Sequence, residues 1–381
     1  MIASESKKHP PTTAVVAAML IGTASMFSNG IQPELFGALT EAHRASAVDV
    51  GHLATVEMLA LAICSAIGPW FHYRGNMRLK VFVLSLLLAA MNLGVWVTHS
   101  IDLLLILRGI AGVLEGLLLG ATIVTMASSR NPPRLFGLFW GLSALPMAVV
   151  SYLLPLWIVP HFGPDGGFAS LALAALIGAG ASWFLISVSK DAASSEARVG
   201  GHRSWNWPTR LGLIGIVIQC ASLGAVWSYQ QLLADQHEFA KGVGDFAVSV
   251  GIVAQVVGSV IASLLCGRLP FRRVILGVIA LETALTALLP AASLPGVYVA
   301  MLIGWNFLFL ATIPTQVEWL MANDRTFQSV NLTSFTSLVG LGIGPSLCAI
   351  GVHGPDVSGA FWIAAGLMAA SGCCYLVPTS R

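Results

Sequence analysis

Long apolar runs, separated by short polar connections, follow one another along the whole chain. A helix that crosses the ~30 Å hydrocarbon core of a bilayer needs about 20 apolar residues, and its backbone hydrogen bonds must be made within the segment. Twelve runs of this kind are present, and each predicts a transmembrane helix. They lie at approximately 13–36, 50–70, 80–98, 101–128, 136–160, 168–188, 210–232, 246–267, 273–290, 296–320, 328–350 and 358–378. The pattern therefore predicts an all-α membrane protein, in which the run at 273–290 is the weakest span.

The composition agrees with this pattern, because only 9 % of the residues are charged and 56 % are hydrophobic. A soluble protein needs a polar surface, and 19 basic and 17 acidic residues cannot cover a chain of 381 residues. This excludes a soluble enzyme. The formal net charge is only +2 and the basic residues fall in short loops, which offers no surface for nucleic acid. The expected partners are membrane lipid and small solutes.

The Lys and Arg residues are distributed unevenly between the two sides of the predicted spans. Short cytoplasmic loops are enriched in these residues. With the N-terminus inside, sixteen of the nineteen fall on the cytoplasmic side, Arg44 and Lys241 fall outside, and Arg108 lies within a span. Both termini are therefore predicted to be cytoplasmic, in a plasma membrane or the inner membrane of a bacterium. Lys7 and Lys8 imitate the start of a signal peptide, but the run after them has the length of a span, so we expect it to be retained.

The longest and most polar connection separates six spans from six. It covers 190–209 and is predicted to be a cytoplasmic linker between an N-terminal six-helix bundle, 1–189, and a C-terminal six-helix bundle, 210–381. Repeats arranged in this way are related by an axis along the membrane normal, and their solute site lies near the midplane between them. Two pseudo-symmetric halves are therefore expected.

Three short stretches carry glycine and basic residues in a pattern that is typical of one transporter family. The loop at 68–75 has a glycine at each end, with His72 where the family has Asp. In the fourth run Arg108 is followed four residues later by Gly112, and the eleventh run reads Gly-Leu-Gly-Ile-Gly-Pro at 340–345. With twelve spans and a central linker, the chain resembles the major facilitator superfamily. The resemblance implies a secondary transporter that alternates between inward-open and outward-open states, with the first, fourth, seventh and tenth spans around a central cavity.

Ionisable residues within the spans are the first candidates for function, because a charge in the membrane costs several kcal/mol unless it is paired or hydrated. Glu57 and Arg108 lie at similar depths from the external face, so they could pair. Glu115 follows Arg108 by almost two helical turns and faces the same way, about 10 Å deeper. We interpret Glu115, Glu57 and Arg108 as a proton-coupling group, in which Glu115 carries the proton and Arg108 tunes it or binds an anionic part of the solute. The alternative is a static ion pair between Glu57 and Arg108.

Three further acids are weaker candidates. Glu282 lies in the middle of the ninth span, where a structural or lipid-facing role competes with coupling. Glu318 and Glu34 lie near predicted span ends and are expected to be interfacial.

Amide and aromatic side chains are concentrated in the four spans that the resemblance places around the cavity. These groups supply hydrogen bonds and flat stacking surfaces for a small organic solute. The predicted substrate-binding residues are Asn29, Gln32, Arg108, Gln219, Tyr229, Trp305 and Asn306. For Tyr229 and its neighbour Trp227 the alternative is the external aromatic belt, where Trp and Tyr collect at the lipid surface.

The sequence contains no motif for a cofactor, a metal or ATP. The six cysteines lie in apolar stretches without metal-ligand spacing, and no phosphate-binding loop or nucleophile elbow occurs, so neither catalytic residues nor an enzymatic activity are expected. The predicted function is proton-coupled secondary active transport of a small organic solute, with efflux favoured over import. Two alternatives stay open: a facilitator or symporter that imports a metabolite anion held by Arg108, and a non-transporting membrane sensor.

Overall fold

The computed structural model describes residues 10–377, apart from 74, 99, 130–131, 187–205, 241, 266–267, 325–328 and 330–331. The described residues are almost entirely helical, with one isolated β-bridge between His353 and Asp356. The predicted linker at 190–209 lies largely outside them. The long helices are α1 (Thr12–Glu41), α2 (Ala47–His72), α3 (Met77–Gly94), α4 (Ile101–Ala127), α5 (Pro132–Leu153), α7 (Pro164–Ala181), α9 (Trp207–Gln236), α10 (Val243–Leu265), α11 (Phe271–Leu288), α12 (Pro295–Asn323), α14 (Thr333–Ala349) and α15 (Ser358–Cys374).

Within the described ranges, ten helical segments are long and apolar enough to cross a membrane. Two more apolar helices, Phe335–Ala349 and Ser358–Cys374, are shorter. The predicted run at 136–160 is interrupted, because α5 continues through a π-helical turn at Leu154–Ile158 into the single-turn helix α6 (Val159–Phe162). Proline cannot donate the backbone hydrogen bond of a regular helix, and this stretch contains two prolines. The chain is therefore a multi-pass membrane protein.

Polar residues in the short connections begin several helices. Ser46 and Asp49 form a capping box at the start of α2, in which each side chain accepts a hydrogen bond from the other's backbone N–H. Asn76 caps α3, and Asn206 caps α9 by accepting a hydrogen bond of 3.0 Å from the Thr209 N–H. Such caps satisfy the first N–H groups of a helix, which have no partner inside it.

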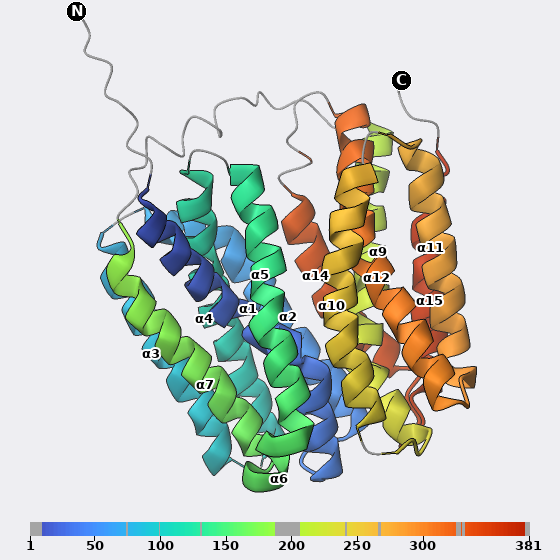
Figure 1. The fold of residues 1–381 in the computed structure, drawn as a ribbon, viewed down its shortest axis with the longest axis horizontal. Helices are drawn as coiled ribbons and strands as arrows, with labels where there is room; N and C mark the ends of the chain where they lie inside the picture. Colours follow the sequence, from blue (N-terminus) through green and yellow to red (C-terminus); the bar gives the residue numbers. More distant parts are fainter. Residues whose placement is uncertain are drawn as a thin grey trace, which may run out of the picture.

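The helices run alternately up and down, so that the start of α1 and the end of α15 lie on the same side of the molecule (Figure 1). We call this side the termini end, and the side that carries α6 the far end. Helices α1 to α7 pack chiefly against one another and form the N-terminal group; α9 to α15 do the same and form the C-terminal group. The largest contacts between the two groups are those of α2 with α14, α5 with α10, and α1 with α9.

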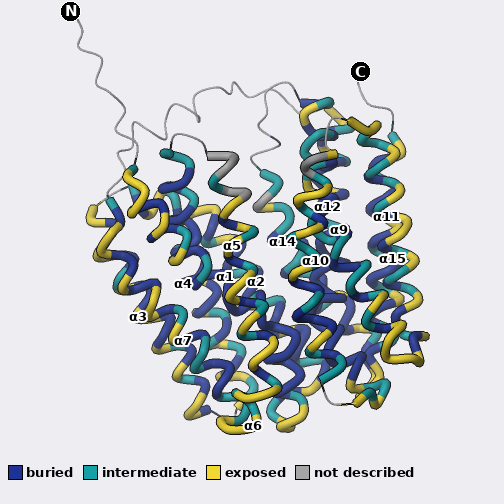
Figure 2. The backbone as a smooth tube through the Cα atoms, in the orientation of Figure 1, coloured by how far each residue is buried: buried dark blue, intermediate teal, exposed yellow. Residues whose placement is uncertain are grey.

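The distribution of polar and apolar side chains suits a lipid environment. Large apolar side chains are exposed on the outer surface, such as Trp70 at 79 % and Val97 at 85 % (Figure 2). Charged side chains lie inside instead, and Arg108, Glu115 and Glu282 are each at most 2 % exposed. In water the outer surface would be costly, whereas in a bilayer it lies against hydrocarbon.

Candidate functional site

A buried guanidinium, that of Arg108 on α4, is the centre of a polar network in the N-terminal group. Its Nε donates to Oε2 of Glu57 on α2 at 2.9 Å, and its Nη2 donates to the other oxygen of the same carboxylate. Nη1 donates to Oδ1 of Asn92 on α3, and Nη2 donates to Oγ of Ser28 on α1, both at 2.7 Å. The guanidinium carbon lies 5.6 Å from the centre of the Phe168 ring on α7. Residues from four other helices therefore surround the Arg108 cation.

Glu115 is a second acid beside the same guanidinium. Its Oε1 lies 3.8 Å from Nη2 of Arg108, and its carboxylate also faces Glu57. All three side chains are at most 3 % exposed. The structure thus brings the three predicted proton-coupling residues together, and two carboxyl groups share one cation. Such an arrangement can take up one proton.

Close packing of α4 on α2 brings Arg108 to Glu57. Gly112, Gly116 and Gly120 form a stripe of small residues on α4 that faces α2. A Cβ atom at Gly116 would lie 2.7 Å from Cβ of Cys64 and 2.8 Å from the backbone nitrogen of Ser65. Small residues four positions apart allow the backbones of membrane helices to approach closely. The Arg108-to-Gly112 motif therefore belongs to the packing that positions the ion pair.

The stretch at 68–75 resembles a family motif, and the structure places its first five residues at the end of α2 rather than in a loop. It also serves this packing. A Cβ atom at Gly68 would lie 2.8 Å from Cα of Gly120 on α4. His72, at the position of the family's Asp, is buried, and its Nε2 lies 2.9 Å from the carbonyl oxygen of Leu117. Gly75 has a φ of 76°, a backbone conformation that favours glycine. His72 therefore joins α2 to α4 by a hydrogen bond rather than by an acidic side chain.

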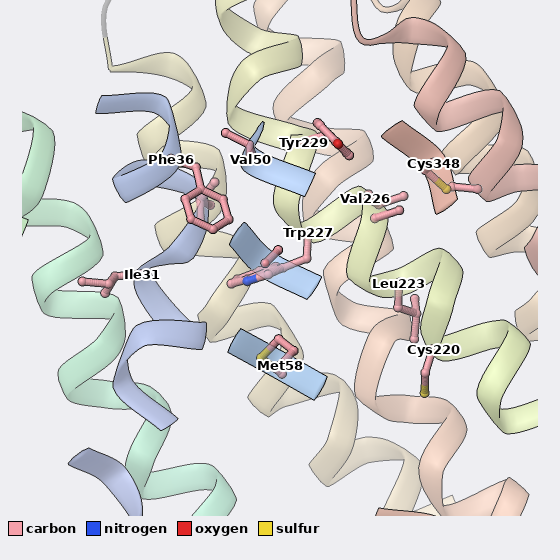
Figure 3. Close-up of a cluster of buried hydrophobic side chains, with 14 of the residues drawn as sticks. Ile31, Phe36, Val50, Met58, Cys220, Leu223, Val226, Trp227, Tyr229 and Cys348 are labelled. Atoms are coloured by element: carbon pink, nitrogen blue, oxygen red, sulfur yellow. The ribbon is translucent and has the colours of Figure 1, made fainter. Parts of the chain in front are cut away.

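The two helix groups are joined by hydrogen bonds nearer the far end of the molecule. Trp227 Nε1 on α9 donates to the backbone oxygen of Asn29 on α1 at 2.8 Å, and the Ser228 hydroxyl donates to Oε1 of Gln32 at 3.3 Å. Buried apolar side chains of α1, α2, α9 and α14 surround this contact (Figure 3). Trp227 is 6 % and Tyr229 0 % exposed, so neither belongs to an aromatic belt at the lipid surface.

Ser346 of α14 joins the C-terminal group to α2. Its backbone N–H donates to Oγ1 of Thr55 at 3.1 Å, and its hydroxyl donates to the backbone oxygen of Gly51 at 3.3 Å. His52 Nδ1 lies 3.1 Å from the same hydroxyl. The adjacent Pro345 accepts a hydrogen bond from the Tyr229 hydroxyl at 3.3 Å. The glycine-proline stretch at 340–345 therefore leads directly into the contact between the groups.

The other predicted substrate-binding residues lie inside the C-terminal group. Gln219 of α9 donates to Oε2 of Glu282 on α11 at 3.1 Å and accepts from Nε2 of Gln316 on α12 at 2.6 Å. Glu282 is thus held by an amide between helices and does not face lipid. Its second oxygen has no partner among the described residues.

Trp305 and Asn306 of α12 point to different neighbours. Trp305 Nε1 donates to Oγ1 of Thr286 on α11 at 3.2 Å, and Asn306 Oδ1 accepts from Nε2 of Gln255 on α10 at 2.7 Å. Both predicted residues are fully buried. The predicted substrate-binding residues therefore lie in three separate places: the Arg108 network, the contact between the groups, and the interior of the C-terminal group.

Sequence reasoning missed two ligands of Arg108. Asn92 is a lone amide in an otherwise apolar run, a signal that could have been used. Ser28 precedes the predicted Asn29, and small hydroxyl residues in apolar helices carry little information by themselves. Phe168 stands among many apolar residues and gave no signal.

No family model matches the chain, and no curated protein matches it in sequence. Solved structures match it over almost their whole length. A nucleoside transporter, NupG, has a TM-score of 0.76 at 11 % identity, with 95 % of this chain and 98 % of that chain covered. A D-xylose–proton symporter has a TM-score of 0.75 at 13 % identity, with 97 % and 98 % covered. A bacterial homologue of the human lysosomal transporter Spinster, inward-facing and unoccupied, has a TM-score of 0.65 at 14 % identity, with 96 % and 94 % covered. The chain has the fold of the major facilitator superfamily transporters.

Proposed function

We propose that this protein is a secondary active transporter that moves a small organic solute across the membrane and couples this movement to protons. The fold supports transport, since all three of the similar structures are named as transporters. In this proposal the chain has twelve spans in two six-helix halves, 1–189 and 210–381, with 190–209 as a cytoplasmic linker and both termini in the cytoplasm. The halves rock about a site near the midplane between them.

One observation carries the proton coupling, namely two buried acids beside one buried cation. Glu57 accepts two hydrogen bonds from Arg108, while Glu115 lies 3.8 Å from the same guanidinium. With both acids ionised the cluster would carry a net charge of −1 away from water, which is costly in the membrane. A proton on Glu115 removes that charge. Glu115 is therefore the proton carrier, and Arg108 and Glu57 set how firmly the proton is held.

The same geometry argues against Arg108 as a clamp for an anionic solute. Its guanidinium already donates to Glu57, Asn92 and Ser28, so a solute carboxylate would have to displace these acceptors. We therefore favour an uncharged solute. In this proposal Asn29, Gln32 and Tyr229 bind it at the contact between the groups. Gln219, Trp305 and Asn306, which lie inside the C-terminal group, are the proposed binding residues of that half. If the termini are cytoplasmic, the far end is the external end. The contact between α1 and α9 nearer that end then supports a conformation that is closed to the outside and faces the cytoplasm.

Counterflow in proteoliposomes tests whether the protein transports at all. The panel contains nucleosides, xylose, amphipathic drugs and aromatic acids, and each solute is loaded inside while its labelled form is added outside. We expect exchange of at least one uncharged solute, and none in empty liposomes. Ligand binding in detergent without exchange in liposomes would instead favour a membrane sensor. Exchange of anionic solutes alone would favour the importer in which Arg108 holds the substrate.

A further inference from the structure

A fourth buried acid, Glu34, lies where the two helix groups meet. It is 2 % exposed on α1, and its Oε1 accepts a hydrogen bond from the Ser151 hydroxyl on α5. The Ser151 oxygen lies 3.4 Å from the hydroxyl oxygen of Ser249 on α10. A chain of polar groups therefore leads from the Glu34 carboxyl in the N-terminal group to the C-terminal group. The sequence had placed Glu34 at a membrane surface, whereas the structure buries it between helices.

The described surroundings of Glu34 offer one side-chain donor, the Ser151 hydroxyl, to stabilise a negative charge. Its Oε2 has no partner among the described residues. The charged group that repels the Glu34 carboxylate is another acid, Asp245 on α10, which Glu41 on α1 repels in turn. Tyr152 on α5 is 48 % exposed and points to the surface.

The arginine in the turn after α1 is engaged elsewhere. Arg44 forms an ion pair with Asp165 and donates to the backbone oxygens of Val95 and Thr98. Lys241 lies outside the described residues. The Glu34 carboxyl is therefore buried next to another acid, with a hydroxyl as its described donor.

Other polar atoms at this contact are also buried without a partner. They are Nε2 of Gln32 on α1 and Oε1 of Gln231 on α9. A buried polar atom without a hydrogen bond costs about 1–3 kcal/mol, and water would remove this cost. The polar groups of this contact therefore suit a second state in which water enters between α1, α5, α9 and α10.

We propose that Glu34 is a second proton-binding site, separate from the Arg108 network, and that its protonated form holds the far end closed. The proton comes from water on the far-end side and returns to it when the contact opens. Once ionised, Glu34 is repelled by Asp245 and requires hydration, which keeps the groups apart. This inference rests on the proposed function in one respect, that the two groups move relative to each other.

The test measures the distance across the far end by electron paramagnetic resonance. Spin labels are attached at Ala42→Cys and Ala240→Cys, two exposed loop positions on opposite groups, after the six native cysteines are replaced. No solute is added. In the labelled protein that retains Glu34, we expect a short distance between the labels at about pH 5. Towards about pH 9 we expect a growing population with a long distance. Glu34→Gln, which is always neutral, should keep the short distance throughout.

Two further variants make the result unambiguous. Asp102→Asn removes an exposed acid at the far-end start of α4 and should leave the pH response intact. Glu34→Met, neutral and of similar length, replaces the glutamine variant if that one does not fold. A distance that ignores pH with Glu34 present, or a Glu34→Gln variant that still responds to pH, overturns the inference. Because the test measures a distance and no solute flux, the inference about Glu34 holds or fails separately from the counterflow result.

Discussion

Arg108→Met is expected to destabilise the protein by about 3–5 kcal/mol, the usual cost of removing one partner of a buried ion pair. The variant leaves Glu57 without its two hydrogen bonds and leaves Asn92 and Ser28 without a donor. These groups come from three helices, so the loss affects the packing of the whole N-terminal group. Thermal unfolding in detergent, followed by tryptophan fluorescence, measures the effect.

The double variant Glu57→Met/Arg108→Met is the matched control. Replacing a buried pair with apolar residues of similar volume is often neutral. We therefore expect the double variant to regain most of the stability that Arg108→Met loses, although proton coupling should be lost. If the double variant is less stable than either single variant, the pair is not coupled in the way that the geometry indicates.

Gly116→Leu is expected to disrupt the contact between α4 and α2. A Cβ atom at this position would lie 2.7 Å from Cβ of Cys64 and 2.8 Å from the backbone nitrogen of Ser65, and backbone atoms cannot rotate away. Inserting side-chain volume into a packed site costs about 1–3 kcal/mol, and more when the backbone must move. The helices α2 and α4 would separate, and Arg108 would be drawn away from Glu57. A lower melting temperature and a smaller folded yield are the expected observations.

Gly366→Leu on α15 provides the comparison. Gly366 is exposed in the middle of its helix, and a Cβ atom there would have nothing within 4 Å. The same change of residue should therefore leave the melting temperature close to that of the unaltered protein. Equal losses in the two variants would mean that the glycine itself, and not the α2–α4 contact, determines the effect.

The sequence was most informative where a pattern repeats or a spacing is fixed. The apolar run at 101–128 predicted the helix observed at Ile101–Ala127 almost residue for residue. The meeting of Glu57 and Arg108 follows from their similar depths, and the position of Glu115 follows from the seven-residue spacing. These inferences need only helix geometry and the thickness of the bilayer.

Glu34 shows where such reasoning ends. The apolar run was predicted to stop near residue 36, which placed Glu34 at the membrane surface. The helix α1 continues to Glu41, so Glu34 lies about 10 Å inside its end at 1.5 Å per residue. Its hydrogen-bond partner Ser151, and Ser249 beside that serine, are more than a hundred residues away along the chain. The hydrogen bond between Gln219 and Glu282 is likewise a tertiary contact, which no local sequence pattern predicts.

The most direct test of the proposed function is solute-evoked proton movement in proteoliposomes with an internal pH dye. The unaltered protein and Glu115→Gln are compared with a solute that both exchange in counterflow. We expect proton movement with the unaltered protein and its loss in Glu115→Gln, because the glutamine cannot bind the proton while solute exchange continues. Solute flux without proton movement in the unaltered protein, or undiminished proton movement in Glu115→Gln, would contradict the role of Glu115 as the proton carrier.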